Sequence, residues 1–252
     1  MGRFTGKVAV VTGSGQGLGQ LYAQALAAQG ASVVIAEVNG ERAKAVADGI
    51  SAAGGTALAV PTDVTDPDSC AAMAAAAADT FGGLDILVNN AAIYAGLQLG
   101  PFEQIDLDLW RKVLDVNVTG LMLASRACVP HMRAAGYGKI VNIASTVAVI
   151  GAPYILHYTA SKGAVLAMTK AMARELAADN IHVTGCAPGG TFTQATKDLL
   201  GSDEVAQQSI DQQALKKPQQ PEDVVPLVLF LCSPESDFVI GQNYVIDGGL
   251  AI

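Results

Sequence analysis

The sequence has little positive charge and no long hydrophobic run. Lysine and arginine supply 15 of its 252 residues against 23 acidic ones, a net charge of −8. Because no basic cluster is present to neutralise phosphates, we expect no nucleic-acid partner. No stretch approaches the ~18 apolar residues of a membrane-spanning helix. The first apolar run is also too short for a secretory signal, so we expect no membrane partner and a cytoplasmic protein.

Cysteine and histidine are few and widely separated. The four cysteines are Cys70, Cys128, Cys186 and Cys232, and the three histidines are His131, His157 and His182. Metal sites and redox pairs need such residues at short, regular spacing. We therefore expect no metal site, and thiols that stay reduced as in cytosolic proteins.

What the sequence does contain is an alternation of two kinds of segment. Apolar, β-branched runs occur at 8–11, 33–36, 57–60, 86–88, 140–144, 181–183 and 244–246. Segments of helical length and composition occur at 17–29, 40–53, 67–81, 104–135, 156–178 and 222–232. The apolar runs are continuous, as in strands covered on both faces.

This alternation predicts parallel strands joined by right-handed crossovers. We expect an α/β fold with one domain over 1–252, a Rossmann-type, doubly wound sheet of about seven parallel strands with helices on both faces. Residues 189–220 depart from the pattern, with Gly189-Gly190, several Gln and Asp, and weak periodicity. We interpret them as a long loop, which in a compact domain is usually functional, and expect it to border a substrate.

Glycines are concentrated between the first predicted strand and the first predicted helix, in Thr12-Gly-Ser-Gly-Gln-Gly-Leu-Gly19. Glycine lets the backbone approach an anion closely, and the N–H groups of a helix N-terminus attract a pyrophosphate. The spacing differs from the common G-x-G-x-x-G, and a flexible turn is the alternative interpretation. The position between a strand and a helix favours a dinucleotide site. Its expected ligating residues are Gly13, Ser14, Gln16, Gly17, Leu18 and Gly19.

The second predicted strand ends at Glu37, 24 residues after Gly13. A carboxylate there can accept hydrogen bonds from the adenosine ribose hydroxyls and repels a 2′-phosphate. The next residue, Val38, and the turn residues Ser14 and Gln16 provide no basic group for such a phosphate. The sequence therefore predicts NAD rather than NADP as cofactor.

A phenol and an ammonium lie four residues apart at Tyr158 and Lys162, on one face of a predicted helix. Alone the pair also fits an exposed helix surface. Ser145, however, follows the 140–144 strand at the carboxyl edge of the sheet, where ligands bind. Oxidation of an alcohol needs a base, and tyrosine, with a pKa of about 10, must be activated for that role. Lys162 and a cationic nicotinamide would lower the pKa of Tyr158, and Ser145 would hold the substrate oxygen.

Taken together, these residues resemble the short-chain dehydrogenase/reductase family, and the likeness covers nearly the whole chain. Further matching segments are Asp63-Val64, Asn89-Asn90-Ala91-Ala92, Asp115-Val-Asn117, Pro188-Gly189-Gly190-Thr191-Phe192-Thr193, and a C-terminal Asp247-Gly248-Gly249. Three residues depart from the family pattern: Ala92 where glycine is usual, Thr184 where asparagine is usual, and Ala144 where serine is frequent, although Ser145 keeps the catalytic spacing.

The resemblance implies four catalytic residues, Asn117, Ser145, Tyr158 and Lys162, with Asn117 holding a water in a proton relay. It implies cofactor contacts at the glycine turn, Tyr158 and Lys162, and also at Glu37, Val38, Asp63, Val64, Asn90, Ala91, Ala92, Pro188, Gly189, Thr191 and Thr193. Paired helices of neighbouring subunits imply a homotetramer, with a dimer as the alternative.

The expected substrate contacts are mostly small or apolar, namely Tyr94, Ser145, Val147, Tyr154, Gly190 and Phe192. They contain no Arg or Lys for a carboxylate or phosphate, which predicts a neutral, hydrophobic secondary alcohol or ketone with a cyclic or aromatic skeleton. The function expected is that of an NAD-dependent alcohol dehydrogenase or ketoreductase. Two alternatives remain open, a 3-oxoacyl-carrier-protein reductase that uses NADPH and a non-catalytic dinucleotide-binding protein.

Overall fold

The computed structural model describes residues 2–200 and 203–252 and contains one seven-stranded sheet. The strand order is β3-β2-β1-β4-β5-β6-β7, and all neighbouring strands pair in parallel. The strands are β1 Val8–Thr12, β2 Ser32–Glu37, β3 Thr56–Pro61, β4 Ile86–Asn89, β5 Gly138–Ile143, β6 Ile181–Pro188 and β7 Asn243–Ile246. The predicted doubly wound, parallel α/β fold is confirmed.

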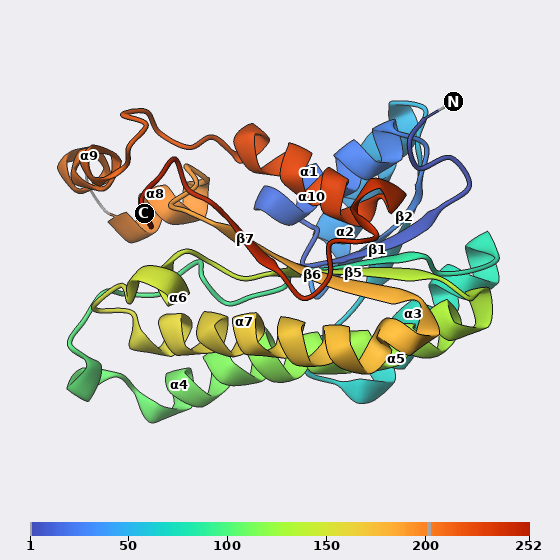
Figure 1. Cartoon of the computed structure of the whole chain (residues 1–252), viewed down its shortest axis with the longest axis horizontal. Helices are drawn as coiled ribbons and strands as arrows, with labels where there is room; N and C mark the ends of the chain where they lie inside the picture. The colour runs from blue at the N-terminus through green and yellow to red at the C-terminus, as the bar shows by residue number, and fades with distance from the viewer. Residues whose placement is uncertain (1, 201–202) are drawn as a thin grey trace.

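Helices cover both faces of this sheet (Figure 1). On one face lie α1 Gly17–Ala28, α2 Gly40–Ala52 and α10 Pro221–Cys232, and their buried side chains form one core with β1, β2 and β6. On the other face lie α3 Pro67–Phe81, α5 Gly120–Ala135 and α7 Leu156–Leu176, which build the second core. None of the helices within the described ranges is long and apolar enough to cross a membrane.

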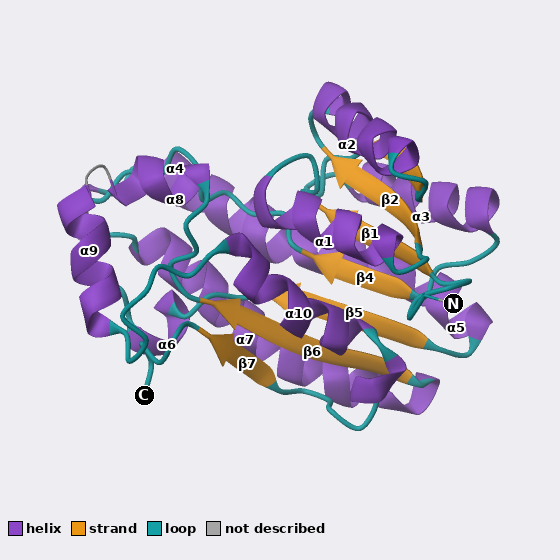
Figure 2. Cartoon of the chain, turned by 90° about the horizontal axis from the view of Figure 1, so that it is seen from above, coloured by secondary structure: helices purple, strands orange, loops and turns teal. Residues whose placement is uncertain are grey.

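The strand order reverses between β1 and β4, because the chain runs outward from β1 to β3 before it returns to β4. At such a switch point the loops after two neighbouring strands leave in opposite directions and open a crevice for a ligand. Figure 2 shows α8 Gln194–Leu200 and α9 Asp203–Gln212 beyond the ends to which the strand arrows point. The topology thus predicts a site at the carboxyl edge, between β1 and β4.

The prediction of an irregular loop over residues 189–220 is wrong, because α8 and α9 lie within it. Both helices are short, and they consist largely of Gln, Asp, Lys, Ala and Leu. These residues have adequate helix propensity, but two or three turns give too few apolar positions to establish a 3.6-residue period.

The segment 104–135, expected as one helix, has several parts. A 3₁₀ turn at Phe102–Gln104 precedes α4 Leu107–Leu114, and a π-helical turn, Asp115–Thr119, joins α4 to α5. Strand β6 is also longer than the predicted run 181–183. Its second half pairs with β5 on one side and with β7 on the other, although it lacks a β-branched run.

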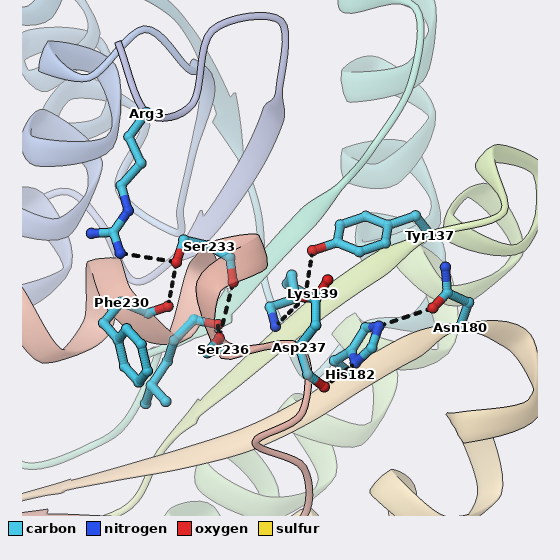
Figure 3. Close-up of polar contacts among 10 residues, drawn as sticks. Arg3, Tyr137, Lys139, Asn180, His182, Phe230, Ser233, Ser236 and Asp237 are labelled. Atoms are coloured by element: carbon cyan, nitrogen blue, oxygen red, sulfur yellow. Dashed lines mark hydrogen bonds and ion pairs between the residues drawn. The ribbon is translucent and has the colours of Figure 1, made fainter.

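The opposite, amino edge of the sheet is held by a polar cluster around Asp237 (Figure 3). Lys139, at the start of β5, is 1% exposed, and its Nζ lies 2.9 Å from Asp237 Oδ1. Tyr137 donates a hydrogen bond of 2.9 Å to the same oxygen. His182 Nδ1 lies 2.8 Å from the Asp237 carbonyl oxygen. These contacts tie the segment before β7 to the starts of β5 and β6, far from the carboxyl edge.

Candidate active site

The four expected catalytic residues lie at the carboxyl edge on three elements. Asn117 comes from the π-helical turn, Ser145 follows β5, and Tyr158 and Lys162 lie one turn apart in α7. All four side chains are buried, with exposures between 1% and 8%. Residues separated by up to 45 positions in the chain are therefore gathered where the topology predicts a ligand.

Lys162 is held in place by its own ammonium group. Nζ donates a 2.7 Å hydrogen bond to the carbonyl oxygen of Ile143, the last residue of β5, and lies 5.6 Å from the ring centroid of Tyr158. Burial lowers the pKa of Lys162 to about 8. The group is still mostly protonated at neutral pH, so it places a positive charge beside the phenol.

Burial raises the pKa of Tyr158 above its usual value, and the nearby Tyr94 adds to this effect, while a hydrogen bond with Ser145 acts in the opposite direction. The folded site without cofactor thus holds a neutral phenol. Additional positive charge near the ring would be required before Tyr158 could accept a proton at neutral pH.

Asn117 connects the loop after β4 to α7. Its Oδ1 accepts a 2.7 Å hydrogen bond from the Ile93 N–H, and its Nδ2 donates to Ser161 Oγ at 3.0 Å. The Ser161 hydroxyl in turn donates to the carbonyl oxygen of Tyr158 at 2.7 Å. The amide therefore fixes backbone on both sides of the site, and the few π-helical turns found in proteins occur frequently at functional sites.

The glycine turn is shaped for close backbone approach. A Cβ on Gly13 would lie 2.7 Å from Ala91 Cα, and one on Gly19 would lie 2.4 Å from both Gly13 O and Asn90 Nδ2. Gly17, the first residue of α1, has φ +58° and faces open space. No acidic side chain stands in the first turn of α1, and Gln16 gives its N–H groups no side-chain cap among the described residues. An anion can take the place of such a cap, so the turn fits a dinucleotide pyrophosphate.

The residues that follow β4 support the glycine turn through hydrogen bonds. Asn90 Nδ2 donates hydrogen bonds of 3.0 Å to the carbonyl oxygens of Thr12 and Gly13. The hydroxyl of Thr12 accepts from the N–H groups of Asn90 and Ala91. Asn90 and Ala91 thus lie beside the turn, and their polar contacts there are with the Thr12 hydroxyl and with the carbonyl oxygens of Thr12 and Gly13.

Glu37 lies at the carboxyl end of β2 with its carboxylate held by neutral donors. Oε2 accepts from the Gly15 N–H at 3.1 Å, and Oε1 accepts from the Asn39 N–H at 3.2 Å. The side chain of the next residue, Val38, is exposed at 69%. A ribose bound along the turn would meet a fixed negative charge here.

A cation that the sequence interpretation missed lies beside Glu37. Arg42, in the first turn of α2, donates a hydrogen bond of 2.9 Å from Nη1 to Gln16 Oε1. A Cβ on Gly15 would lie 2.6 Å from Glu37 Cγ and 2.9 Å from Arg42 Cβ, so both side chains flank one glycine. The signal available in the sequence was the position of Arg42 five residues after Glu37, at the start of a predicted helix.

The remaining expected cofactor residues lie around the same edge. The Asp63 carboxylate accepts from both the N–H and the hydroxyl of Thr65 and is thus engaged locally, while Val64 is buried. The Pro188 carbonyl accepts from Ser145 Oγ at 3.4 Å, which brings the 188–193 segment to the catalytic serine. Within that segment Thr191 and Thr193 make tight turns through their N–H groups.

Of the expected substrate residues, Tyr94 packs against the ring of Tyr158. Its ring centroid is 5.0 Å from that of Tyr158, with the ring planes tilted by 47°. Val147, Ile155 and Leu199 of α8 belong to the same apolar cluster. The backbone N–H of Val147 donates to Ser145 Oγ at 3.4 Å. The wall beside the phenol is therefore apolar, and α8 closes one side of it.

Tyr154 lies at the rim rather than in this wall. Its side chain is 59% exposed and its φ is +66°, a left-handed conformation that bulky residues rarely adopt. Its carbonyl oxygen accepts a 2.9 Å hydrogen bond from the Gly100 N–H. Gly190 and Phe192 lie in the segment before α8, where the Phe192 N–H donates to the Gln219 carbonyl oxygen.

Comparison with known proteins identifies the family. Residues 13–251 match a family model described as enoyl-(acyl carrier protein) reductase. The 3-alpha-(or 20-beta)-hydroxysteroid dehydrogenase of Mycobacterium tuberculosis is 40% identical, over 98% of this chain and 90% of that one. The chain belongs to the short-chain dehydrogenase/reductase family. As a member it is an oxidoreductase whose cofactor is a nicotinamide dinucleotide.

Two further relatives of this dehydrogenase/reductase are similar over nearly their whole length. The trans-4-hydroxycyclohexanecarboxylate dehydrogenase of Sinomonas cyclohexanicum is 39% identical over 98% of this chain and 93% of that one. A solved structure of a 7 alpha-hydroxysteroid dehydrogenase complexed with NADH and 7-oxo glycochenodeoxycholic acid has a TM-score of 0.92 at 34% identity. That comparison covers 98% of this chain and 95% of the other.

Proposed function

We propose that this protein is an NAD(H)-dependent dehydrogenase that interconverts a secondary alcohol on an alicyclic ring with its ketone. The proposal rests on the buried phenol of Tyr158, which lies beside Ser145 and the Lys162 ammonium. The same phenol packs against an apolar cluster that contains Tyr94 and Val147. The named substrates of the hydroxycyclohexanecarboxylate and hydroxysteroid dehydrogenases are ring alcohols, which supports a substrate of this kind.

In this proposal each residue acts on one atom of the substrate carbinol. Bound NAD⁺ supplies the hydride acceptor. Tyr158, as phenolate, takes the hydroxyl proton, and the Ser145 hydroxyl holds the substrate oxygen by a hydrogen bond. The Lys162 ammonium stabilises the phenolate, and Asn117 holds the loop and helix that position it. In the direction of reduction, the Tyr158 phenol donates its proton to the carbonyl oxygen.

The preference for NAD rests on the Glu37 carboxylate. A ribose with two free hydroxyls can donate to it, whereas a 2′-phosphate would be repelled in a site of reduced dielectric constant. We infer a strong preference for NAD(H), measurable as the ratio of kcat/KM with NADH to that with NADPH. A ratio near one, or below one, would contradict this part of the proposal.

The chemistry is tested with Tyr158→Phe, which removes the proton-accepting oxygen and keeps the ring. We expect turnover of cyclohexanol-type alcohols to fall by at least about 10³-fold while NAD⁺ still binds, as measured by calorimetry. Tyr137→Phe, at the amino edge, is the matched control and should keep full turnover. Substantial activity of Tyr158→Phe would refute the mechanism.

The substrate class is tested with a panel under identical conditions. Ring alcohols of increasing size, from a substituted cyclohexanol to a steroid, are compared with open-chain alcohols and with a 3-hydroxyacyl thioester. We expect the highest kcat/KM among the ring alcohols. A clear preference for the thioester would favour the acyl-carrier reductase alternative. The description of the matching family model also names an acyl carrier protein, but for enoyl rather than 3-oxoacyl reduction.

A further inference from the structure

The cation of Arg42 has no assigned task in the reaction. It lies in the first turn of α2, on the exposed side of the glycine turn, and donates to Gln16 Oε1 at 2.9 Å. Within the described residues Arg42 takes part in no ion pair, although Glu37 flanks the same glycine. Arg42 and Glu37 thus lie on either side of Gly15, and they form no ion pair with each other.

The Glu37 carboxylate is occupied by other donors. Both of its oxygens accept from backbone N–H groups, those of Gly15 and Asn39, which hold the carboxylate back against the turn. Among the described residues, the Arg42 guanidinium makes one side-chain hydrogen bond, so further N–H donors remain available to a ligand. Guanidinium groups match the geometry of a phosphate and can bind it through two parallel hydrogen bonds.

We propose that Arg42 is a preformed ligand for a 2′-phosphate, and that Glu37 alone keeps NADP out. This inference rests on the proposed function, because it takes the Glu37 side of the turn as the place of the adenosine ribose. Arg42 would attract the 2′-phosphate and Glu37 would repel it. The preference for NAD then reflects the difference between these two effects, and not the lack of a group that can bind the phosphate. Removal of the carboxylate alone then creates an NADP-binding protein.

The test is a double-substitution cycle on Glu37→Gln and Arg42→Gln. The readout is the dissociation constant of 2′,5′-ADP and of ADP-ribose, measured by calorimetry, since these fragments report binding without turnover. We expect Glu37→Gln to tighten 2′,5′-ADP by about 10- to 100-fold, the range for a hydrogen-bonded charge. Adding Arg42→Gln should reverse most of that gain.

Two control variants distinguish an effect of the Arg42 charge from a general loss of structure. Arg42→Lys should retain part of the gain, because it keeps the charge but loses the paired donors. Lys44→Gln, which removes an exposed cation of α2 that pairs with Asp48, should change either affinity by less than about twofold. Thermal unfolding of each variant verifies that the turn is still folded.

The result that overturns the inference is an equal loss of 2′,5′-ADP and ADP-ribose affinity on Arg42→Gln in the Glu37→Gln background. A Glu37→Gln protein that does not gain 2′,5′-ADP affinity also refutes it. Failure of the proposed function gives a different result, namely a wild-type protein that fails to bind ADP-ribose or to oxidise any ring alcohol.

Discussion

The buried ammonium of Lys162 makes the candidate active site costly for folding, and this cost is measurable as a pH dependence. A fall of the pKa from 10.5 in the unfolded chain to about 8 in the folded one corresponds to about 3 kcal/mol. Above pH 10.5 the lysine is neutral in both states, and there is no penalty. Below pH 8 it is charged in both, and the full penalty applies.

Between these limits the unfolded state binds a proton that the folded state does not. Stability therefore rises with pH across this window. Lys162→Met removes the group, so its free energy of unfolding should lack the contribution. We expect the difference between wild type and Lys162→Met to shift by about 3 kcal/mol in favour of wild type between pH 8 and pH 10.5.

The assay is urea denaturation of both proteins without cofactor at several pH values across the window. Titrating groups distant from Lys162 cancel in the difference, and the lost hydrogen bond to Ile143 adds an offset that does not depend on pH. Lys170→Met, at an exposed position of α7, is the matched control and should stay within about 0.5 kcal/mol of wild type. Parallel curves for wild type and Lys162→Met would refute the reasoning.

Four further predictions concern other parts of the molecule. Gly19→Ala should lower the free energy of unfolding by about 1–3 kcal/mol in urea and weaken NAD⁺ binding, because its Cβ would clash with backbone. Gly49→Ala, inside α2 and facing open space, should instead stabilise by up to about 1 kcal/mol. Asp237→Asn leaves the buried Lys139 ammonium without its counter-charge. It should cost about 1–2 kcal/mol, since the carboxylate is partly exposed, and leave kcat/KM unchanged. Tyr154→Gly should raise stability by about 1 kcal/mol by relieving a left-handed backbone, while KM for a bulky ring alcohol rises.

The fold could be predicted because each strand except the later part of β6 contains a run of β-branched or apolar residues. Such runs, alternating with amphipathic segments, are nearly sufficient to define a doubly wound sheet. The grouping of Ser145 and Tyr158 could be predicted as well, since parallel strands bring their carboxyl ends to one edge. The hydrogen bonds of Ser145 and Tyr158 and the burial of Lys162 depend on tertiary packing, so they could not be predicted from the sequence.

The features that the sequence did not predict are those that produce no regular spacing of apolar residues. A π-helical turn contains one residue more than an α-helical turn but has the same kinds of residue. The sequence therefore indicates one continuous helix over 104–135. Helices α8 and α9 are too short and too polar to give a clear period. Arg42 was not predicted because its long side chain brings the guanidinium to Gln16, 26 positions earlier in the sequence, and sequence position alone does not indicate this contact.

The π-helical turn at Asp115–Thr119 has a consequence for how this helix tolerates length changes. Because a π-helical turn accommodates one more residue than an α-helical turn over nearly the same rotation, deleting one residue from it would restore a regular α-helix and leave the directions of α4 and α5 nearly unchanged. Side chains inside the turn would change direction, however, and Asn117 would leave the Ile93 backbone. Relatives of this protein that change length here are thus expected to do so on the loop side of α4, upstream of Leu107, where an added residue alters no helical phase.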